Sequence, residues 1–185
     1  MRFVLPGPPK NLWTIGHSTL PIETFIAHLA AHRIETLADV RRHAGSRRHP
    51  QFNPEALAST LAANGVRYVP MPVLGGRRRP RPDSRNTNWR NESFRGYADY
   101  METPAFASAL AGLAREASAA RCAIMCAEAL WWRCHRSLIA DALKACGTAV
   151  WNIGGDGEVS EHPYTSVAHV AHGDLTYGSG EDLFT

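Results

Sequence analysis

The sequence lacks any apolar stretch as long as a membrane-spanning helix, and its amino terminus carries no long apolar run. We therefore expect no membrane partner. Cysteine is also scarce, because the four cysteines show none of the dense spacing of a secreted disulfide scaffold. Two of them, Cys122 and Cys146, stand in apolar surroundings, as small core residues do. These features predict a cytoplasmic protein with reduced thiols.

Internal repeats are absent as well, and so is a glycine fingerprint for phosphate, because Gly75-Gly76 lacks both the spacing and the following helix. A chain of 185 residues with 44% hydrophobic content is large enough for one well-packed core. We expect a single domain over 1–185, with its core at about 12–153. Residues 154–185 show no clear periodicity, which predicts an irregular C-terminal extension. The sequence makes no prediction of the oligomeric state.

A large excess of charge is also missing, since the formal net charge is only +3, but the arginines are concentrated in or beside two loops. They are Arg41, Arg42, Arg47 and Arg48, followed by Arg77, Arg78, Arg79, Arg81, Arg85, Arg90 and Arg95. Clustered guanidinium groups bind phosphate, and the nearby aromatic residues Trp89 and Phe94 can stack on bases. The alternative is a solvated basic surface. We expect a nucleic acid, DNA before RNA, or a nucleotide as the partner.

Strand and helix patterns alternate along the chain. The predicted strands are 12–16, 35–41, 66–70, 121–126 and 149–153, and the predicted helices are 21–32, 54–64, 94–101, 103–119 and about 135–146. This order predicts an α/β fold, with a mainly parallel sheet of about five strands and helices on both faces. Ligands bind such sheets beyond the carboxyl ends of the strands. A loop of about twenty residues from Leu74 is a candidate lid or binding arm.

Polar side chains collect at three predicted strand ends: His17 and Ser18, Asp39 and Arg41, and Cys126 and Glu128. A second polar stretch, Cys134-His-Arg-Ser137, lies where the next helix begins. The free N–H groups of a helix start favour negative charge, so an anionic substrate group or a Cys134 thiolate would be stabilised there. The strand-to-helix junction around 126–137 is therefore the predicted site.

Five short motifs appear in a fixed order: Thr14-Ile-Gly-His-Ser18, Asp39-Val-Arg41, Leu74-Gly-Gly76, Cys126-Ala-Glu128 and Cys134-His-Arg136. Together they resemble the family numbered 488 among the domains of unknown function, from about Leu12 to Ile153. The resemblance implies a shared α/β fold and a shared polar site at these motifs, but no activity. The sequence departs from the family pattern at 129–133, where Ala-Leu-Trp-Trp-Arg replaces more polar residues.

The first functional hypothesis is carboxylate chemistry on a nucleic acid or nucleotide, such as hydrolysis of an N-glycosidic bond in DNA repair. Glu128 would be the nucleophile or general base, Asp39 the second carboxylate, and His17 and Arg136 would orient the substrate. We list Glu128, Asp39, His17, Cys126 and Cys134 as candidate catalytic residues. The candidate substrate-binding residues are Ser18, Arg41, Arg42, Arg47, Arg77, Arg78, Trp131, Trp132, His135 and Arg136.

Three alternatives remain open. Cys126 or Cys134 could attack sulfur or phosphorus, as in rhodanese-like sulfurtransferases and cysteine-dependent phosphatases, although Arg133 lies one residue beyond the phosphatase spacing and the loop contains no glycine. The basic loops could also form a non-enzymatic nucleic-acid-binding module around an architectural network, in which Asp39 pairs with Arg136 or Arg41. A metal site of Cys126, Cys134, His135 and His17 matches no familiar zinc spacing, so we expect no metal or cofactor.

Overall fold

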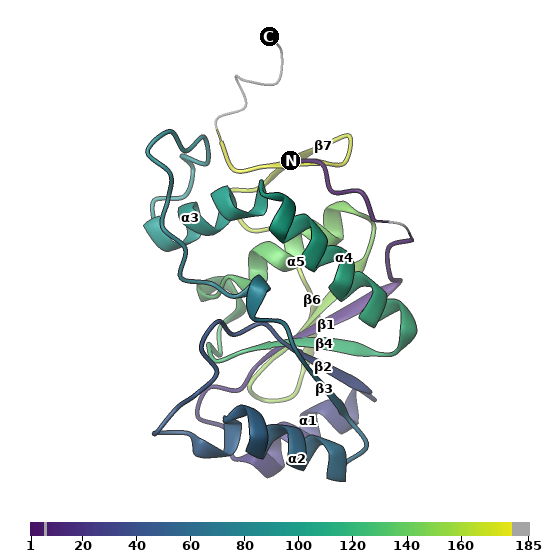
Figure 1. Cartoon of the computed structure of the whole chain (residues 1–185). Helices are drawn as coiled ribbons and strands as arrows, with labels where there is room; N and C mark the ends of the chain where they lie inside the picture. The colour runs from purple at the N-terminus through teal and green to yellow at the C-terminus, as the bar shows by residue number, and fades with distance from the viewer. Residues whose placement is uncertain (6, 179–185) are drawn as a thin grey trace.

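A six-stranded sheet forms the centre of the protein (Figure 1), and the computed structural model describes residues 1–5 and 7–178 of the chain. The strand order is β3-β2-β4-β1-β5-β6. Its first five strands run parallel, and the last is antiparallel to its neighbour. The strands are β1 (Asn11–Gly16), β2 (Thr36–Asp39), β3 (Arg67–Pro70), β4 (Cys122–Cys126), β5 (Ala149–Ile153) and β6 (Val159–Glu161).

Helices cover both faces of the sheet, two on one side and three on the other (Figure 1). Helices α1 and α2 share one hydrophobic core with the sheet, and α3, α4 and α5 share the second. This arrangement confirms the predicted single-domain α/β fold. Among the described residues, no helix has the length and apolar character needed to cross a bilayer. The helices are α1 (Ile22–Ala31), α2 (Pro54–Ala63), α3 (Glu92–Met101), α4 (Pro104–Ala119) and α5 (Arg136–Ala145), with short 3-10 turns η1 (Pro50–Phe52), η2 (Pro72–Leu74) and η3 (Trp131–Arg133).

Strand β4 shows how the sequence specifies two cores. Its side chains alternate in direction, so Cys122 and Ile124 pack in the core of α3 to α5, whereas Ala123 and Met125 pack in the core of α1 and α2. All four are fully buried, as expected for a central parallel strand with helices on both faces. Cys126, at the end of the strand, continues the alternation and lies on the α5 side. The strand therefore delivers one thiol to the carboxyl edge of the sheet.

The predicted irregular C-terminal extension is wrong at 159–161, 169–171 and 174–176, which form strands. Strand β6 extends the sheet, and β7 (His169–Ala171) pairs with β8 (Asp174–Thr176) in a hairpin. Each of these strands has only three residues, and those of β6 and β7 are exposed, so neither hydrophobic alternation nor length signals them. Buried side chains nevertheless anchor the segment, among them His162 and Tyr177. Residues 179–185 of the predicted extension lie outside the described residues.

The long loop after η2 is fastened along helix α3. The Asp99 carboxylate accepts hydrogen bonds from the backbone N–H of Arg81 (2.8 Å), the hydroxyl of Ser84 (2.6 Å) and the amide of Asn86 (2.8 Å). Asp99 is itself buried, so these bonds are protected from water. The arginine-rich segment predicted as a candidate lid therefore runs over a fixed path on the surface of α3.

Candidate functional site

Three metal-ligating or nucleophilic side chains meet at the carboxyl edge of the sheet. Cys126 ends β4, and Cys134 and His135 directly precede α5. The Nδ1 atom of His135 lies 3.6 Å from the Sγ atom of Cys134 and 4.0 Å from that of Cys126. They line a pocket of about 380 Å³, whose other walls are Arg77, Ser93, Phe94, Ala127, Glu128 and Arg133. The predicted strand-to-helix junction is thus an open site with room for a small ligand.

The imidazole of His135 is fixed in one orientation. Its Nε2 atom lies 3.0 Å from the carbonyl oxygen of Val40, and because a carbonyl only accepts, Nε2 carries the proton. The Nδ1 atom then faces the two sulfur atoms. The ring also packs against Gly76, where an added Cβ would come within 2.8 Å of Nδ1. This contact explains why the Leu74-Gly75-Gly76 motif is part of the site although it contributes no reactive group.

The two thiols have unequal acidity in this arrangement. A hydrogen bond from Cys134 and the neighbouring imidazole of His135 hold the pKa of Cys126 well below its ordinary value, against the opposing effect of burial. Burial and the nearby sulfur of Cys126 raise the pKa of Cys134 well above its ordinary value. Of the two thiols, Cys126, the more exposed one, is therefore the one that loses its proton first.

The rim of the pocket carries more positive than negative charge. Arg77 and Arg133 are exposed, and within the described residues neither forms an ion pair. Glu128 is the carboxylate of the pocket wall; it is exposed, and one oxygen accepts a 3.2 Å hydrogen bond from the backbone N–H of Leu130. Two unpaired guanidinium groups beside one carboxylate suit an anionic ligand.

Asp39 and Arg41, predicted to join Glu128, are instead sealed inside the protein. The Asp39 carboxylate accepts bonds from the Arg41 guanidinium at 2.6 and 2.8 Å and from the Tyr68 hydroxyl at 2.7 Å. Only 2% of Asp39 and 7% of Arg41 is exposed. Neither residue lines the pocket of Glu128. This pair matches the architectural network that the sequence left open as an alternative for Asp39.

His17 belongs to the same sealed cluster. Its ring stacks on Phe52 with centroids 4.1 Å apart, Nδ1 lies 3.0 Å from the carbonyl of Ser18, and Nε2 lies 3.3 Å from an Arg41 nitrogen. Burial, followed by the charge of Arg41, lowers the pKa of His17 to about 4. His17 is therefore a neutral imidazole at neutral pH, with its proton on Nδ1. It is not placed to contact a ligand in the pocket.

Arg136 shapes the loop between the two cysteines. It is 1% exposed, and its guanidinium donates to the carbonyl oxygens of Glu128 and Ala129, the latter at 2.7 Å. On the other side of this loop, Gly16 lies so close to the Glu128 carbonyl that any Cβ would overlap it. Arg136 and Gly16 therefore hold the backbone that presents Glu128, and Arg136 does not reach the pocket as a substrate-binding group.

The other predicted substrate-binding residues divide between the pocket rim and its surroundings. Arg78 lies over the Tyr100 ring at 3.7 Å and donates to backbone carbonyls, so its charge serves the local fold. Arg42 donates to the Arg77 carbonyl at 3.1 Å, which joins the two basic loops, and Arg47 is exposed. Ser18, with φ 43°, donates its backbone N–H to Ala127.

The two tryptophans line a different pocket. Trp131 and Trp132 lie edge to face, and with residues 152–160 they border a hollow of about 460 Å³. Trp132 is 53% exposed and Trp131 is half-buried. The chain segment 128–130 lies between this hollow and the pocket of Cys126. Ala129 and Leu130 line the tryptophan hollow, whereas Glu128 lines the pocket of Cys126. The predicted stacking residues are therefore neighbours of the site and lie outside its wall.

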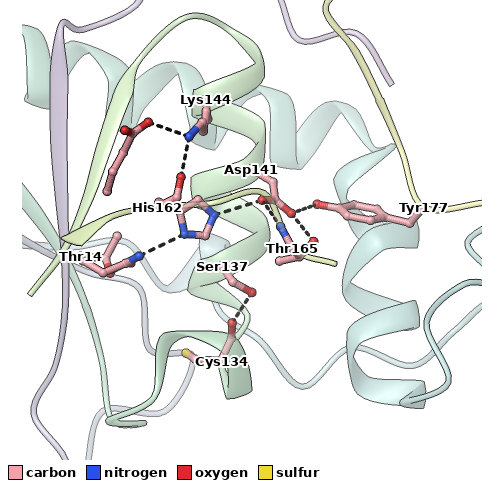
Figure 2. A network of polar contacts seen from close by, with 10 residues as sticks. Thr14, Cys134, Ser137, Asp141, Lys144, His162, Thr165 and Tyr177 are labelled. Atoms are coloured by element: carbon pink, nitrogen blue, oxygen red, sulfur yellow. Dashed lines mark hydrogen bonds and ion pairs between the residues drawn. The ribbon is translucent and has the colours of Figure 1, made fainter. Parts of the chain in front are cut away.

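A buried network around Asp141 was not predicted (Figure 2). The Asp141 carboxylate, on α5, accepts hydrogen bonds from His162 Nε2 (3.0 Å), the Thr165 hydroxyl and backbone N–H (2.6 and 3.0 Å) and the Tyr177 hydroxyl (2.9 Å). All four residues are buried. The donors come from the segment predicted to be irregular, so the sequence offered no periodic signal for them. Asp141 thus fastens the C-terminal segment to α5.

The fold and the pocket define an α/β protein. Its candidate site lies beyond the central parallel strands and combines cysteine, histidine and carboxylate side chains. The family model described as a domain of unknown function, DUF488, matches residues 21–143. The chain therefore belongs to the DUF488 family, and the match covers β2, β4 and the pocket residues Cys126, Cys134 and His135. No curated protein and no solved structure matches the chain.

Proposed function

We propose that this protein is a hydrolase that acts on a phosphate-bearing substrate, a nucleic acid or a nucleotide, in the pocket of Cys126, Glu128, Cys134 and His135. The observation that carries the proposal is the pocket wall itself, where an exposed carboxylate lies among ligating side chains and beside the unpaired Arg77 and Arg133. Such a mixture of reactive groups and free positive charge is typical of sites that bind and convert anionic substrates.

Glu128 is the group that we assign to the chemistry. Its backbone is held by Arg136 and Gly16, so its carboxylate projects from a fixed loop. It can take a proton from an attacking water, or stabilise positive charge on a sugar during cleavage of an N-glycosidic bond. The sealed position of Asp39 removes it as a second carboxylate, so Glu128 acts with the groups of the pocket. Arg77 and Arg133 would bind phosphate, and Phe94 offers an aromatic face to a base.

DNA is the first substrate class to test, and base removal the first reaction. Single- and double-stranded oligonucleotides with intact, damaged and mismatched bases, matching RNA and free nucleotides are incubated with the protein, and the products are resolved by mass spectrometry. We expect Glu128→Gln to lower the rate on the active substrate by about 100- to 10,000-fold, because the amide cannot accept a proton. The matched control is Glu55→Gln, an exposed glutamate in the first turn of α2, on the opposite face of the sheet.

Two outcomes would overturn the proposal. An active substrate whose turnover is unchanged by Glu128→Gln would remove Glu128 from the chemistry. Steeply salt-dependent binding of nucleic acid with no product, equal in the wild type and in Glu128→Gln, would instead identify a binding module. Unchanged thermal unfolding of both variants excludes misfolding as the cause. The reduced cysteines that the pocket needs are compatible with the cytoplasm, which we propose as the compartment.

A further inference from the structure

Two of the separations among the three candidate ligand atoms of the pocket are close to those of a tetrahedral metal site. Cys126 Sγ, Cys134 Sγ and a ring nitrogen of His135 all lie within 4.8 Å of one another, and the two sulfur-to-nitrogen distances are 4.0 and 3.6 Å. Bonds of about 2.3 Å from zinc to sulfur and about 2.0–2.1 Å from zinc to nitrogen place sulfur and nitrogen about 3.6 Å apart in a tetrahedron. Both sulfur-to-nitrogen distances therefore lie within a few tenths of an ångström of the value that a bound metal ion requires.

The orientation of His135 is that of a metal ligand. Metal-binding histidines commonly donate their second ring N–H to a carbonyl or carboxylate, which fixes the tautomer and aims the other nitrogen at the metal. His135 makes this bond to Val40, and its Nδ1 atom faces the sulfur atoms. Gly76 and the Tyr97 ring, 5.1 Å away, hold the imidazole from the sides. Contacts within the protein therefore hold His135 in the orientation of a metal ligand.

We propose that Cys126, Cys134 and His135 bind one divalent transition-metal ion of the zinc class, with its fourth coordination position open to the pocket. Two thiolates and an imidazole form a donor set that zinc prefers over magnesium or calcium. Three protein ligands with one open position distinguish catalytic zinc sites from structural ones, which are closed by a fourth residue. The ligands come from a strand end and a helix start, with η3 between them, which is why their spacing matches no familiar zinc pattern.

The metal site stands on geometry alone, but its chemical consequence rests on the proposed function. A water on the open position would lie in the same pocket as Glu128. Zinc lowers the pKa of such a water to about 7, so Glu128 can take its proton and leave a bound hydroxide. The hydroxide forms a bond to the substrate carbon or phosphorus, and the bond to the leaving group breaks. The leaving group keeps the electron pair and receives the proton from Glu128, so the step is balanced as a hydrolysis.

The test uses untagged, reduced protein, because an added histidine tag would bind metal itself. Elemental analysis after incubation with zinc and removal of the excess is expected to give one metal ion per chain for the wild type. Cobalt added to metal-free protein is expected to give the intense visible bands of four-coordinate cobalt and the ultraviolet band of thiolate ligation. Both signals should be lost in Cys134→Ser and His135→Ala. They should persist in Cys146→Ser, a half-buried cysteine that lies outside the pocket.

Several results would overturn the metal site. These are a wild type that binds neither zinc nor cobalt, binding that is equal in Cys134→Ser, or a Cys126–Cys134 disulfide that persists under reducing conditions. The wild-type cobalt spectrum needs no variant, so a variant that misfolds cannot hide a negative result. The two proposals can fail separately. Metal binding without turnover of any nucleic acid or nucleotide would contradict the hydrolase, whereas turnover by fully metal-free protein would contradict the role assigned to the metal.

Discussion

Helix α5 carries two polar clusters that differ in how their polar atoms are satisfied. At its middle, Asp141 receives four hydrogen bonds from buried donors, and nothing of the carboxylate faces water (Figure 2). At its start, Cys134 and His135 join Cys126 at the wall of an open pocket. Buried polar groups cost stability unless they are paired, so the first cluster is explained by the fold alone. The second cluster presents its thiol and imidazole groups to an open pocket, and this difference makes it the candidate functional site.

The Asp39 cluster shows that a place at a strand end does not decide whether a polar cluster is buried and fully hydrogen-bonded or open to a pocket. Asp39 ends β2 at the same sheet edge as Cys126, yet Arg41 and Tyr68 saturate its carboxylate. The Asp39 cluster and the Cys126 pocket lie at the same edge of the sheet, so this position does not separate them. The number of internal partners separates them, and this number follows only from the packed structure.

The largest effect is expected from removing the carboxylate of Asp141, which is the acceptor of the buried network on α5. Asp141→Ala leaves three side-chain donors and one backbone N–H without a partner, so we expect the free energy of unfolding to fall by about 3–5 kcal/mol. Denaturant unfolding measures it. Glu128→Ala, an exposed carboxylate of the open pocket, is the comparison, with an expected change within about 0.5 kcal/mol. Similar losses in both variants would erase the distinction between the clusters.

A smaller effect is expected from the pH dependence of the sealed His17. Folded His17 binds a proton only near pH 4, because burial and Arg41 lower its pKa, whereas the unfolded side chain binds one below about 6.5. The unfolded state therefore holds more protons between these values, and the stability falls as the pH drops from about 6.5 to 4. We expect His17 to account for about 1–3 kcal/mol of that loss.

The contribution of His17 is isolated by comparing unfolding curves of the wild type and His17→Gln. The glutamine can still accept a bond from Arg41 but does not titrate. We expect the variant to lose less stability than the wild type between pH 6.5 and 4. Parallel pH profiles would show that His17 does not titrate as a sealed group.

The smallest effect concerns the open rim. Arg133→Ala removes one of the two unpaired charges, and we expect the slope of log affinity against log salt for a single-stranded oligonucleotide to decrease by about 0.7. Fluorescence anisotropy over a salt series measures the slope. Arg115→Ala, an exposed arginine on α4, should leave it unchanged. An equal decrease in both variants would mean that binding follows the net charge of the chain and is not localised at the pocket.

The sequence predicts much of this structure where the signal is periodic. The burial of β4 and the helices that follow each strand come from regular hydrophobic patterns, so the parallel sheet and its two helical layers are predicted correctly. Cys126, Glu128, Cys134 and His135 are predicted to be close together because they flank one strand-to-helix junction. Local connectivity is enough for that prediction.

The remaining features depend on partners far away in the chain. Asp39 is sealed by Tyr68 on a neighbouring strand, and Asp141 by Tyr177 near the end of the described chain, and no local pattern announces either contact. The orientation of His135 depends on Val40, whose carbonyl lies 3.0 Å from Nε2 across a long sequence separation. Such contacts are set by tertiary packing, so they become visible only in the structure.

The way in which the arginine-rich segment is fastened has a thermodynamic consequence for binding. Gly75 lies against Arg42, Gly76 against His135, and Asp99 holds the stretch beyond them. The backbone that carries Arg77 is thus held by contacts within the protein. Binding of a partner to this segment therefore costs little backbone conformational entropy. The favourable electrostatic free energy of the guanidinium groups is not offset by the ordering of a flexible loop. Affinity on this face should accordingly be limited by desolvation and side-chain freezing.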